Sequence, residues 1–419
     1  SRRRHTIVSR DWSSDVCSSD LTNFGKNIKK RYDMSYDPHS NEWLLNRFEI
    51  YKDLRTRDTA YWSDKYNVHV ITRYDDVFFA LNNPKIFSSA GGNLLIESGE
   101  RLGKTLGASD NPVHNDYKNI VLQAYAKENM QRVSKVFTEK ATKLLENKTE
   151  INISEVTEEL GAWLSTELLN SPLDKEEANQ LTLYTHRHHP LVSVEQPDKN
   201  ADNKFMKLFA RVKIKSSSGP GVYSEYVNNN PKQLDVPALI VGPMMTGPGS
   251  TAGALQYLTL DLFYENQLDS VLNDRSLIPE TVNESLRFRA AVGRFTRTVT
   301  EDITMHGVNL KPGDRVAISL ESANRDPASW INPDKFLIHR TDKVKHLSWG
   351  HGAHACIALA ITKEMIRTYL KVLLNQVGRY EILTKPEDLK YVLMFGGNIS
   401  IMSRSEEHTS ELQSRETIS

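Results

Sequence analysis

Residues 347–358 read Leu-Ser-Trp-Gly-His-Gly-Ala-His-Ala-Cys-Ile-Ala and form the most informative pattern in the chain. Its cysteine, Cys356, follows a glycine-rich turn and precedes an apolar run that predicts a helix. Gly350 and Gly352 let the backbone turn tightly around the sulfur. A cysteine that binds a metal must be a thiolate, whose charge is held by backbone N–H groups and a helix N-terminus. The stretch therefore predicts the proximal ligand of a haem iron, although a single cysteine near glycines, taken alone, is more often a buried structural thiol.

The two ends of the chain are polar and lack apolar periodicity. Both resemble translated sequencing-library adapters, and neither has enough apolar side chains to fold. We therefore predict that residues 1–21 and the tail 404–419 are not native, and that residues 22–403 form one domain. Natural disordered tails are the alternative. Of the two cysteines, Cys17 lies in the excluded N-terminal segment.

The composition is that of an ordinary globular protein with balanced charge. Lys plus Arg and Asp plus Glu both number 53, which argues against binding of nucleic acid through bulk electrostatics. A single cysteine in the predicted domain excludes an internal disulfide and indicates a reducing compartment, for which we predict the cytoplasm. The sequence has no run of about 18 apolar residues, so we expect no membrane-spanning segment.

Helical periodicity dominates the chain, and strand-like runs are short. Helices are expected at residues 41–55, 74–82, 113–124, 129–145, 155–168, 175–184, 203–213, 236–264, 277–287 and 357–377. Strands are expected at residues 69–72, 297–300, 303–305, 315–319 and 399–402, with a hairpin turn at 308–314. The pattern predicts a mainly α protein with small β-sheets.

The cysteine stretch resembles the haem-binding loop of bacterial, soluble cytochrome P-450 enzymes, whose pattern is Phe-Gly-x-Gly-x-His-x-Cys-x-Gly. Trp349 replaces the phenylalanine and Ala358 replaces the last glycine. Tryptophan is a larger aromatic that can still shield the sulfur, and its N–H can donate a hydrogen bond nearby. The resemblance covers nearly all of the predicted domain and implies the cytochrome P-450 fold with haem b (iron protoporphyrin IX). It also implies that Cys356 binds the iron, that Trp349 and Gly350 surround it, and that His354 contacts a haem propionate.

A Glu-x-x-Arg motif supports the resemblance. Glu284 and Arg287 lie three residues apart in a predicted helix, so they share a face and can pair. Such pairs are common on surfaces, but Asn-Pro-Asp-Lys-Phe follows at residues 332–336, at the spacing found in the family. The resemblance implies a buried Glu–Arg network that supports the cysteine loop, in which loss of one partner would leave a buried charge.

Two more motifs imply contacts to the haem propionates. Arg297, in Arg294-Phe-Thr-Arg297, occupies the position of the family's propionate-binding arginine. His114 and Lys118 are spaced i and i+4 and share a helix face, where the family usually has histidine and arginine. Lysine keeps the positive charge but cannot donate two parallel hydrogen bonds. Taken alone, Arg297 is equally well explained as an exposed strand residue.

The predicted central helix departs from the family. The family places an acid and then an alcohol here, in Ala-Gly-x-Asp/Glu-Thr, whereas this chain has Gly249 and Ser250, followed by Thr251. Pro243 and Pro248 each remove a helix N–H group. We therefore expect a bent or broken helix above the iron, with free carbonyls that face a polar cavity. Protons would then arrive through Ser250, Thr251, ordered water or the substrate's own hydroxyls. A packing kink is the alternative.

This proline–glycine interruption resembles a subset of the family that demethylates small methoxy-aromatics or methylated sugars. The segment that would cover the substrate is polar and contains His188 and His189, as sugar binding requires. Ordinary solvated loop polarity is one alternative, and a metal site at the clustered histidines is another. The apolar pocket wall is expected from four residues: Leu94, Met245, Val292 and Phe395.

The first functional hypothesis is a haem-thiolate monooxygenase that uses O₂ and electrons to O-demethylate a small methoxylated substrate and releases formaldehyde. A methylated sugar is favoured over a methoxy-aromatic. Because no flavin or ferredoxin segment is fused to the chain, we expect a ferredoxin and a ferredoxin reductase to supply the electrons. Lys343 and Lys345 can dock an acidic ferredoxin, although surface solvation explains them equally well.

Three other hypotheses remain open. The first is hydroxylation of a C–H bond in another small molecule. The second is peroxide-driven oxygenation, which bypasses proton delivery. The third is a haem-binding protein without turnover, which the missing acid at Gly249 makes conceivable.

Overall fold

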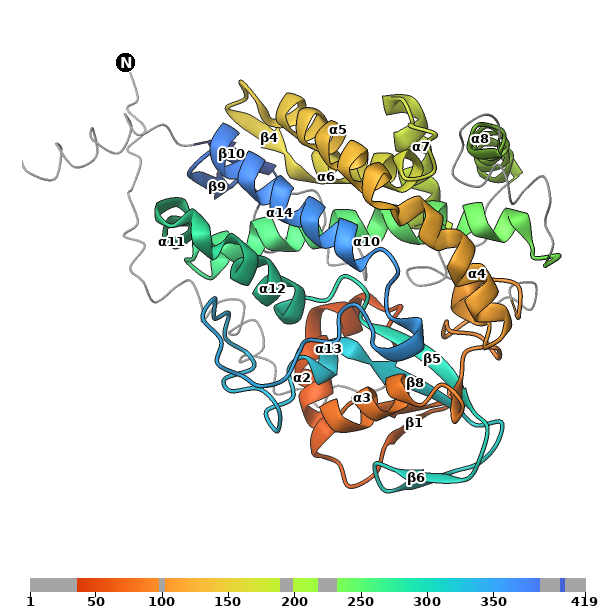
Figure 1. Cartoon of the computed structure of the whole chain (residues 1–419). Helices are drawn as coiled ribbons and strands as arrows, with labels where there is room; N and C mark the ends of the chain where they lie inside the picture. Colours follow the sequence, from red (N-terminus) through yellow and green to blue (C-terminus); the bar gives the residue numbers. More distant parts are fainter. Residues whose placement is uncertain (1–35, 98–101, 189–198, 218–231, 385–399, 404–419) are drawn as a thin grey trace, which may run out of the picture.

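The computed structural model describes residues 36–97, 102–188, 199–217, 232–384 and 400–403 (Figure 1). In chain order the helices are α2 (Asn41–Thr56), α3 (Tyr74–Asn82), α4 (Val113–Val121), α5 (Lys127–Leu145), α6 (Ile153–Glu167), α7 (Lys175–His188), α8 (Lys199–Ser217), α10 (Val236–Tyr264), α11 (Leu268–Asn273), α12 (Ile278–Phe288), α13 (Leu320–Ala323) and α14 (Leu359–Gln376). Short 3-10 turns are η2 (Leu106–Ala108), η3 (Leu122–Tyr125), η4 (Arg275–Leu277) and η5 (Gly352–His354). Most long helices lie on one side of the molecule, opposite the largest sheet. The mainly α architecture is confirmed.

Three small sheets complete the fold. The strands are β1 (Tyr61–Ser63), β2 (Val68–Ile71), β3 (Phe87–Ser88), β4 (Glu150–Asn152), β5 (Arg294–Val299), β6 (Ile303–Met305), β7 (Val308–Leu310), β8 (Arg315–Ser319), β9 (Tyr380–Ile382) and β10 (Ser400–Ser403). The largest sheet has the order β1-β2-β8-β5-β3, in which only the β2–β8 pair is parallel. The other two sheets have the orders β4-β10-β9 and β6-β7.

The register of β5 separates its side chains between two faces. Arg294 pairs with Ser319 of β8, and Arg297 pairs with Val316. Because successive strand residues point to opposite faces, Arg294 and Arg297 lie on opposite faces of the sheet. The side chains of the two arginines therefore contact different parts of the molecule.

Helices α6 and α10 form the centre of the helical side and approach each other very closely. A Cβ atom on Gly161 of α6 would lie 2.4 Å from the carbonyl oxygen of Pro248 in α10. A Cβ atom on Gly247 would likewise collide with the side chain of Ser165. Only glycine allows this separation, so the glycines of both helices are required by packing.

The central helix α10 is continuous, so of the bend or break that was expected the break does not occur. It begins at Asp235, whose side chain accepts a hydrogen bond from the Ala238 N–H, and it continues through Pro243 and Pro248 to Tyr264. Each proline removes one intrahelical hydrogen bond, but the close contact with α6 holds the turn in place. The Pro248 carbonyl faces Gly161 and not a polar cavity, so at this point the interruption serves packing.

Buried hydrogen bonds fix the second half of α10. Thr259 contacts the Tyr369 hydroxyl of α14 at 2.9 Å, and Asp261 accepts from Ser285 of α12 at 2.8 Å.

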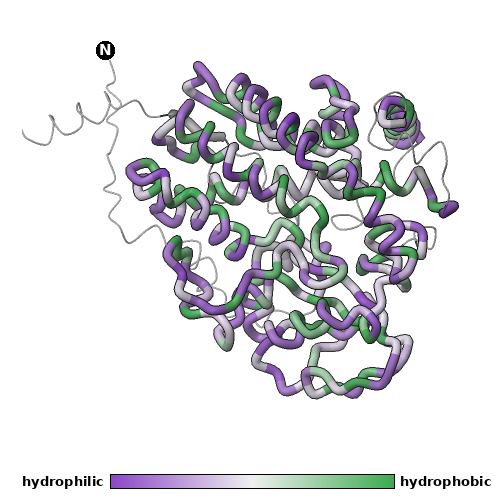
Figure 2. Tube along the Cα trace, viewed as in Figure 1, coloured by the Kyte–Doolittle hydropathy of each residue, from purple (hydrophilic) through white to green (hydrophobic). Residues whose placement is uncertain are grey.

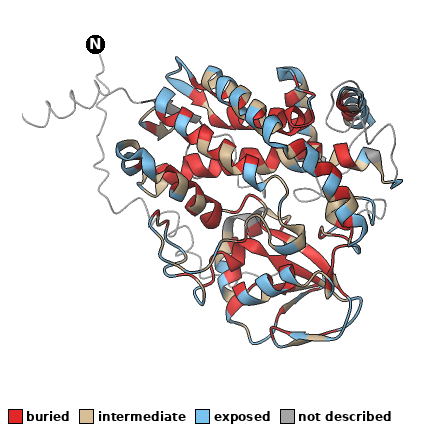
Figure 3. Ribbon diagram, in the orientation of Figure 1, coloured by how far each residue is buried: buried red, intermediate tan, exposed pale blue. Residues whose placement is uncertain are grey.

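Buried residues fill these helices and the strands of the largest sheet (Figure 3). Hydrophilic residues lie mainly on the outer helices and loops (Figure 2). Within the described ranges, no helix has the length and apolar character that crossing a bilayer requires.

Every helix expected from periodicity occurs, with boundaries shifted by a few residues. The last one begins at Leu359 and not at residue 357, because Ile357 and Ala358 form the turn that precedes it. The segment 308–314 is a strand, β7, followed by the turn, and not a turn alone. The short elements α11, α13, β1, β3, β4 and β9 were not expected, since they span at most six residues each and show no periodicity.

Candidate functional site

The cysteine loop is a set of tight backbone turns that only glycine allows. Gly350 and Gly352 have φ angles of +65° and +68°. A Cβ atom on Gly352 would lie 2.5 Å from the carbonyl oxygen of Leu81 in α3, so the neighbouring helix also excludes a side chain. The Cys356 N–H donates to the Trp349 carbonyl at 2.8 Å and closes the loop.

The backbone N–H groups of Ala358 and Leu359, at the start of α14, favour the thiolate form of Cys356, as the sequence predicts for a loop that holds a thiolate. Burial raises the pKa of the Cys356 thiol, and these two N–H groups act in the opposite direction. The side chain is nevertheless solvent-accessible. Both observations fit a sulfur that lies among protein atoms and keeps one open face toward a ligand.

Basic side chains from three elements converge beside this loop. The rings of His114 and His354 lie 4.2 Å apart. Lys118 donates to the carbonyl of Ala353 in the cysteine loop at 3.2 Å. The guanidinium of Arg297 is buried and donates to the Thr296 carbonyl at 2.7 Å. The structure therefore brings together all four residues expected at the haem propionates.

This basic cluster (His114, Lys118, Arg297 and His354) carries excess positive charge. Burial lowers the pKa of Arg297 to about 10, which leaves it charged at neutral pH. Burial, followed by the charge of Arg297, lowers the pKa of His354 to about 3, and burial also lowers the pKa of His114. Both imidazoles are therefore neutral, and two cations face one carboxylate, Asp110, which lies 4.0 Å from His354.

The donor set fits a dianionic ligand such as the two propionates of a haem. The Nδ1 atom of His114 and the indole N–H of Trp349 are buried and have no hydrogen-bond partner among the described residues. The hydrogen bond expected from Trp349 to the surrounding protein is therefore not formed within these residues. Charged acceptors would satisfy His114 and neutralise Lys118 and Arg297.

Replacing Arg297 with alanine should weaken haem retention. Loss of one charge-assisted contact costs about 10-fold to 100-fold in affinity, so the variant should release haem correspondingly faster to an excess of an acceptor globin. Arg297→Lys should recover part of this loss. Lys311→Ala, which removes an exposed pair with Asp302, should behave as wild type. Equal haem release from all of these proteins would reject Arg297 as a haem contact.

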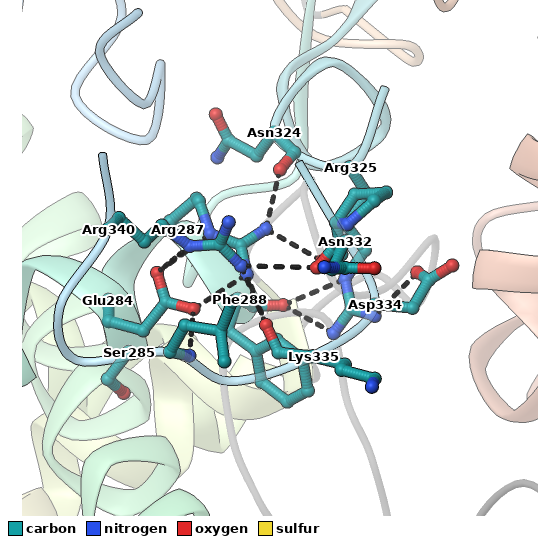
Figure 4. Close-up of polar contacts among 12 residues, drawn as sticks. Glu284, Ser285, Arg287, Phe288, Asn324, Arg325, Asn332, Asp334, Lys335 and Arg340 are labelled. Atoms are coloured by element: carbon teal, nitrogen blue, oxygen red, sulfur yellow. Dashed lines mark hydrogen bonds and ion pairs between the residues drawn. The ribbon is translucent and has the colours of Figure 1, made fainter. Parts of the chain in front are cut away.

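A buried salt-bridge network surrounds Glu284 and Arg287 (Figure 4). Arg287 donates to both carboxylate oxygens of Glu284 at 2.8 Å, and both side chains are at most 2% exposed. Arg287 also donates to the carbonyls of Asn324, Pro333 and Lys335. The network therefore joins α12 to the loop that follows α13.

Arg340 is a third member of this network that the sequence pattern did not reveal. Its Nε donates to Glu284 at 2.7 Å, so one carboxylate binds two guanidinium groups. Asn324 extends the network to the cysteine loop, because its side-chain oxygen accepts from the Leu347 N–H at 2.7 Å. Ser348 completes the link by donating to the Leu286 carbonyl at 2.6 Å.

On α10, the hydroxyl groups expected to deliver protons lie at different depths. Ser250 is half-buried, and its hydroxyl donates back to the Thr246 carbonyl at 2.8 Å. Thr251 and Gly249 are buried. The Thr246 hydroxyl, which is exposed and one turn earlier, donates in the same way to the Gly242 carbonyl at 2.8 Å. Both alcohols thus bond to their own helix, a geometry that rotation about one bond changes.

The structure separates the residues expected to line the substrate pocket. Leu94 and Val292 pack in one apolar cluster, together with Ala252 of α10. Met245 packs against a different cluster. His188 is the last residue of α7, and its side chain is not described. His189 and Phe395 lie outside the described residues.

Among the described residues, no three His, Cys, Asp or Glu side chains lie close enough together to hold a metal ion. The histidine-rich segment after α7 falls outside the described ranges.

Asp110 is a further residue at the site whose role the sequence pattern did not reveal. It accepts hydrogen bonds from the hydroxyl of Ser88 and from the N–H of Ser89, at 2.9 Å for the latter.

Comparison with known proteins points to one family. The family model for cytochrome P-450 matches residues 268–395. Pulcherriminic acid synthase of Bacillus subtilis is 25% identical over 369 residues, which cover 81% of this chain and 90% of that protein. The methyl-branched lipid omega-hydroxylase of Mycobacterium bovis is 24% identical over 331 residues, which cover 73% of this chain and 77% of that protein.

Solved structures share the fold at low sequence identity. The heme domain of CYP116B5 from Acinetobacter radioresistens has a TM-score of 0.77 and 20% identity, covering 91% of this chain and 100% of that one. The ligand-free cytochrome P-450 TbtJ1 has a TM-score of 0.72 and 21% identity, covering 85% of this chain and 97% of that one. The expected fold is therefore confirmed over nearly the whole predicted domain.

Proposed function

Because the chain belongs to the cytochrome P-450 family of haem-dependent monooxygenases, we propose that it removes the methyl group from a small methoxylated substrate, with a methylated sugar favoured. The observation that carries this proposal is Gly249 in place of the acid that the family uses for proton delivery. A substrate rich in hydroxyl groups can supply part of that path itself. Ser250 and Thr251 supply hydroxyls at the adjacent positions.

The cysteine loop and the basic cluster would bind different parts of the cofactor. Haem b, bound through Cys356, supplies the iron that activates O₂. The N–H groups of Ala358 and Leu359 would stabilise the thiolate charge, and the positively charged basic cluster would hold the propionates. The tight turns at Gly350 and Gly352 fix the sulfur relative to α14.

The overall reaction consumes the methyl ether R–O–CH₃, one O₂, two electrons and two protons. One oxygen atom enters a C–H bond of the methyl group and gives R–O–CH₂OH, and the other leaves as water. The hemiacetal then breaks its O–CH₂ bond to give R–OH and formaldehyde. The protons would pass through hydroxyls such as that of Ser250, whose O–H group donates to the Thr246 carbonyl and can rotate away from it.

We further propose that a separate ferredoxin and its reductase supply the two electrons. Lys343 and Lys345 precede the cysteine loop and give that side positive charge, which favours an acidic protein partner.

The test is a formaldehyde assay on the purified haem-loaded enzyme with a surrogate ferredoxin system. O-methyl hexoses should give formaldehyde in proportion to NAD(P)H consumed, and methoxybenzoates should give at least about 10-fold less, the discrimination that one unsatisfied polar group produces. A hydroxylated product without formaldehyde would reject demethylation in favour of C–H hydroxylation. Turnover with hydrogen peroxide alone would favour the peroxide-driven alternative, and haem binding without any turnover would favour the non-enzymatic one.

A further inference from the structure

Helices α7 and α8 form an antiparallel pair at one edge of the helical side of the molecule (Figure 1). The rings of Tyr184 in α7 and Phe205 in α8 stack with their centroids 4.2 Å apart. Farther along, Arg211 of α8 donates to Glu177 of α7 at 2.7 Å. Because these contacts follow each other in opposite order along the two helices, the helices run in opposite directions and are joined at two points. They therefore present a common outer surface, and we call them the α7–α8 pair.

The inner face of α8 is buried against the protein. Four of its apolar side chains belong to an apolar cluster that also contains residues of α4, α7 and α10: Phe205, Leu208, Phe209 and Val212. These positions recur at the spacing of one face of a helix. The apolar residues on the opposite, outer face of α8 lie outside this cluster, so packing against the protein does not explain them.

The outer face of the α7–α8 pair carries large apolar side chains that are exposed to solvent. Among the described residues, four large apolar side chains are at least half exposed, and three of them lie on the pair: Leu183 at 56%, Met206 at 50% and Ile214 at 66%. Met206, Ala210 and Ile214 are spaced four residues apart, so they follow one another along one face of α8, and all three are exposed. Single apolar residues on a surface need no explanation, whereas a line of them indicates a contact surface.

Positive charge is concentrated on the same helix. α8 contains six basic side chains and one acidic side chain, Asp202, although the charges of the whole chain balance. Asp202 accepts from the hydroxyl of a tyrosine in α7 at 3.3 Å. α7 contains two basic and two acidic side chains, so the α7–α8 pair has five net positive charges when its histidines are neutral. Lys207 and Lys215 directly follow Met206 and Ile214, and both lysines are exposed, so cations border the apolar line.

The residue types on the outer face favour a lipid surface over a protein partner. The centres of protein–protein interfaces are enriched in aromatic residues and arginine and depleted in lysine. This outer face instead combines Leu183 and Ile214 with lysines. A lysine places its apolar stem along hydrophobic surface while its ammonium group reaches outward to a charge. Apolar side chains bordered by lysines are typical of segments that lie in the interface of a bilayer with anionic lipids.

We propose that the outer face of the α7–α8 pair binds the surface of a bilayer that contains anionic lipids. Leu183, Met206 and Ile214 enter the boundary between headgroups and acyl chains, and the lysines of α8 contact the anionic headgroups. This attachment is peripheral, and it agrees with the absence of a bilayer-crossing helix from the described ranges. The inference goes beyond the proposed function and does not depend on it, because neither the haem nor the substrate takes part.

The test is co-sedimentation of the haem-loaded protein with vesicles of phosphatidylcholine, either pure or mixed with phosphatidylglycerol. The wild type should bind the mixed vesicles, and added salt should weaken this binding because it screens the lysines. Ile214→Ser should weaken binding by about 10-fold to 100-fold, since it removes one apolar side chain from the bilayer. Lys207→Gln should weaken binding by about 5-fold, since it removes one contact to an anionic headgroup. Far-UV circular dichroism checks that each variant is folded.

Two exposed residues outside the α7–α8 pair serve as matched controls. Ile331 is 61% exposed and lies in the loop after α13, and Lys85 is exposed between α3 and β3. Ile331→Ser and Lys85→Gln are the same chemical changes as those in the two test variants, and both should bind the mixed vesicles as the wild type does. A similar loss in a control variant would overturn the proposal, because overall charge or apolarity would then determine binding.

Binding of the wild type to mixed vesicles, with the losses expected in Ile214→Ser and Lys207→Gln, supports the proposal. No binding to mixed vesicles, equal binding to pure phosphatidylcholine, or equal binding by Ile214→Ser and wild type would overturn it. If sedimentation velocity without vesicles showed a dimer that Ile214→Ser dissociates, the face would belong to a second copy of the chain. If Lys207→Gln slowed ferredoxin-driven NAD(P)H consumption and no vesicles were bound, the face would belong to a protein partner. Either of the last two results would reject the lipid assignment.

Discussion

Replacing Cys356 with serine should abolish the absorption band of the reduced carbon monoxide complex that gives the family its name. That band requires a thiolate on the iron, and Cys356 is the only cysteine within the described residues. Supporting residues around a metal site already cost 10-fold to 100-fold when lost, so removal of the ligand itself should lower turnover by more than about 100-fold. The measurement combines the difference spectrum with oxygen-dependent NAD(P)H consumption.

The matched control is Cys17→Ser, which changes the other cysteine of the chain. It should keep both the band and the activity. If Cys356→Ser retained the thiolate band, or if the wild type showed the spectrum of a histidine-ligated haem, the assignment of Cys356 would be wrong.

Arg287→Ala should destabilise the protein by about 3–5 kcal/mol, the cost of breaking a buried ion pair by removing one partner. The substitution removes both bonds to Glu284 and the three to backbone carbonyls, none of which solvent can replace at this depth. A protein of ordinary stability, about 5–15 kcal/mol, would lose a large share of it. Urea denaturation followed by far-UV circular dichroism measures the change.

Two comparisons sharpen this expectation. Arg287→Lys keeps the charge but cannot reach both carboxylate oxygens and the carbonyls at once, so it should also destabilise. Arg379→Ala, which breaks an exposed pair with Asp269, should cost less than about 1 kcal/mol. A loss at Arg287 as small as that at Arg379 would show that the network does not support the fold.

The helical part of the fold could be predicted from the sequence because long amphipathic segments carry a strong periodic signal. Short elements such as α13 and β9 carry none, and their strand or helix character comes from tertiary pairing. The error at α10 has a clear cause. Pro243 and Pro248 were weighed as local helix breakers, but the contact of Gly161 and Gly247 across two helices outweighs that local cost.

The proximal site was predictable because its residues lie in short local motifs. Glu284 pairs with Arg287 as expected, and His354 lies beside His114, whereas the contacts of Cys356, His354 and Arg297 with a haem stay predictions. Arg340, Asn324 and Asp110 were missed, since single polar residues in loops carry no pattern until the fold brings them together. Arg294 illustrates the same limit, because only the coordinates show that a buried guanidinium has no partner.

The network around Glu284 and Arg287 consists of protein atoms alone, whereas the basic cluster has an unbalanced positive charge. We therefore expect the network to fold before haem binds, and the basic cluster to reach its final arrangement only when haem binds. The loop that carries the sulfur can be in place on the nascent chain before any cofactor arrives, and the cationic rim then attracts the anionic edge of the incoming haem. Haem would thus bind to a cysteine loop that is already folded. Cells starved of haem should accumulate a chain in which the Glu284–Arg287 network and the cysteine loop are already native.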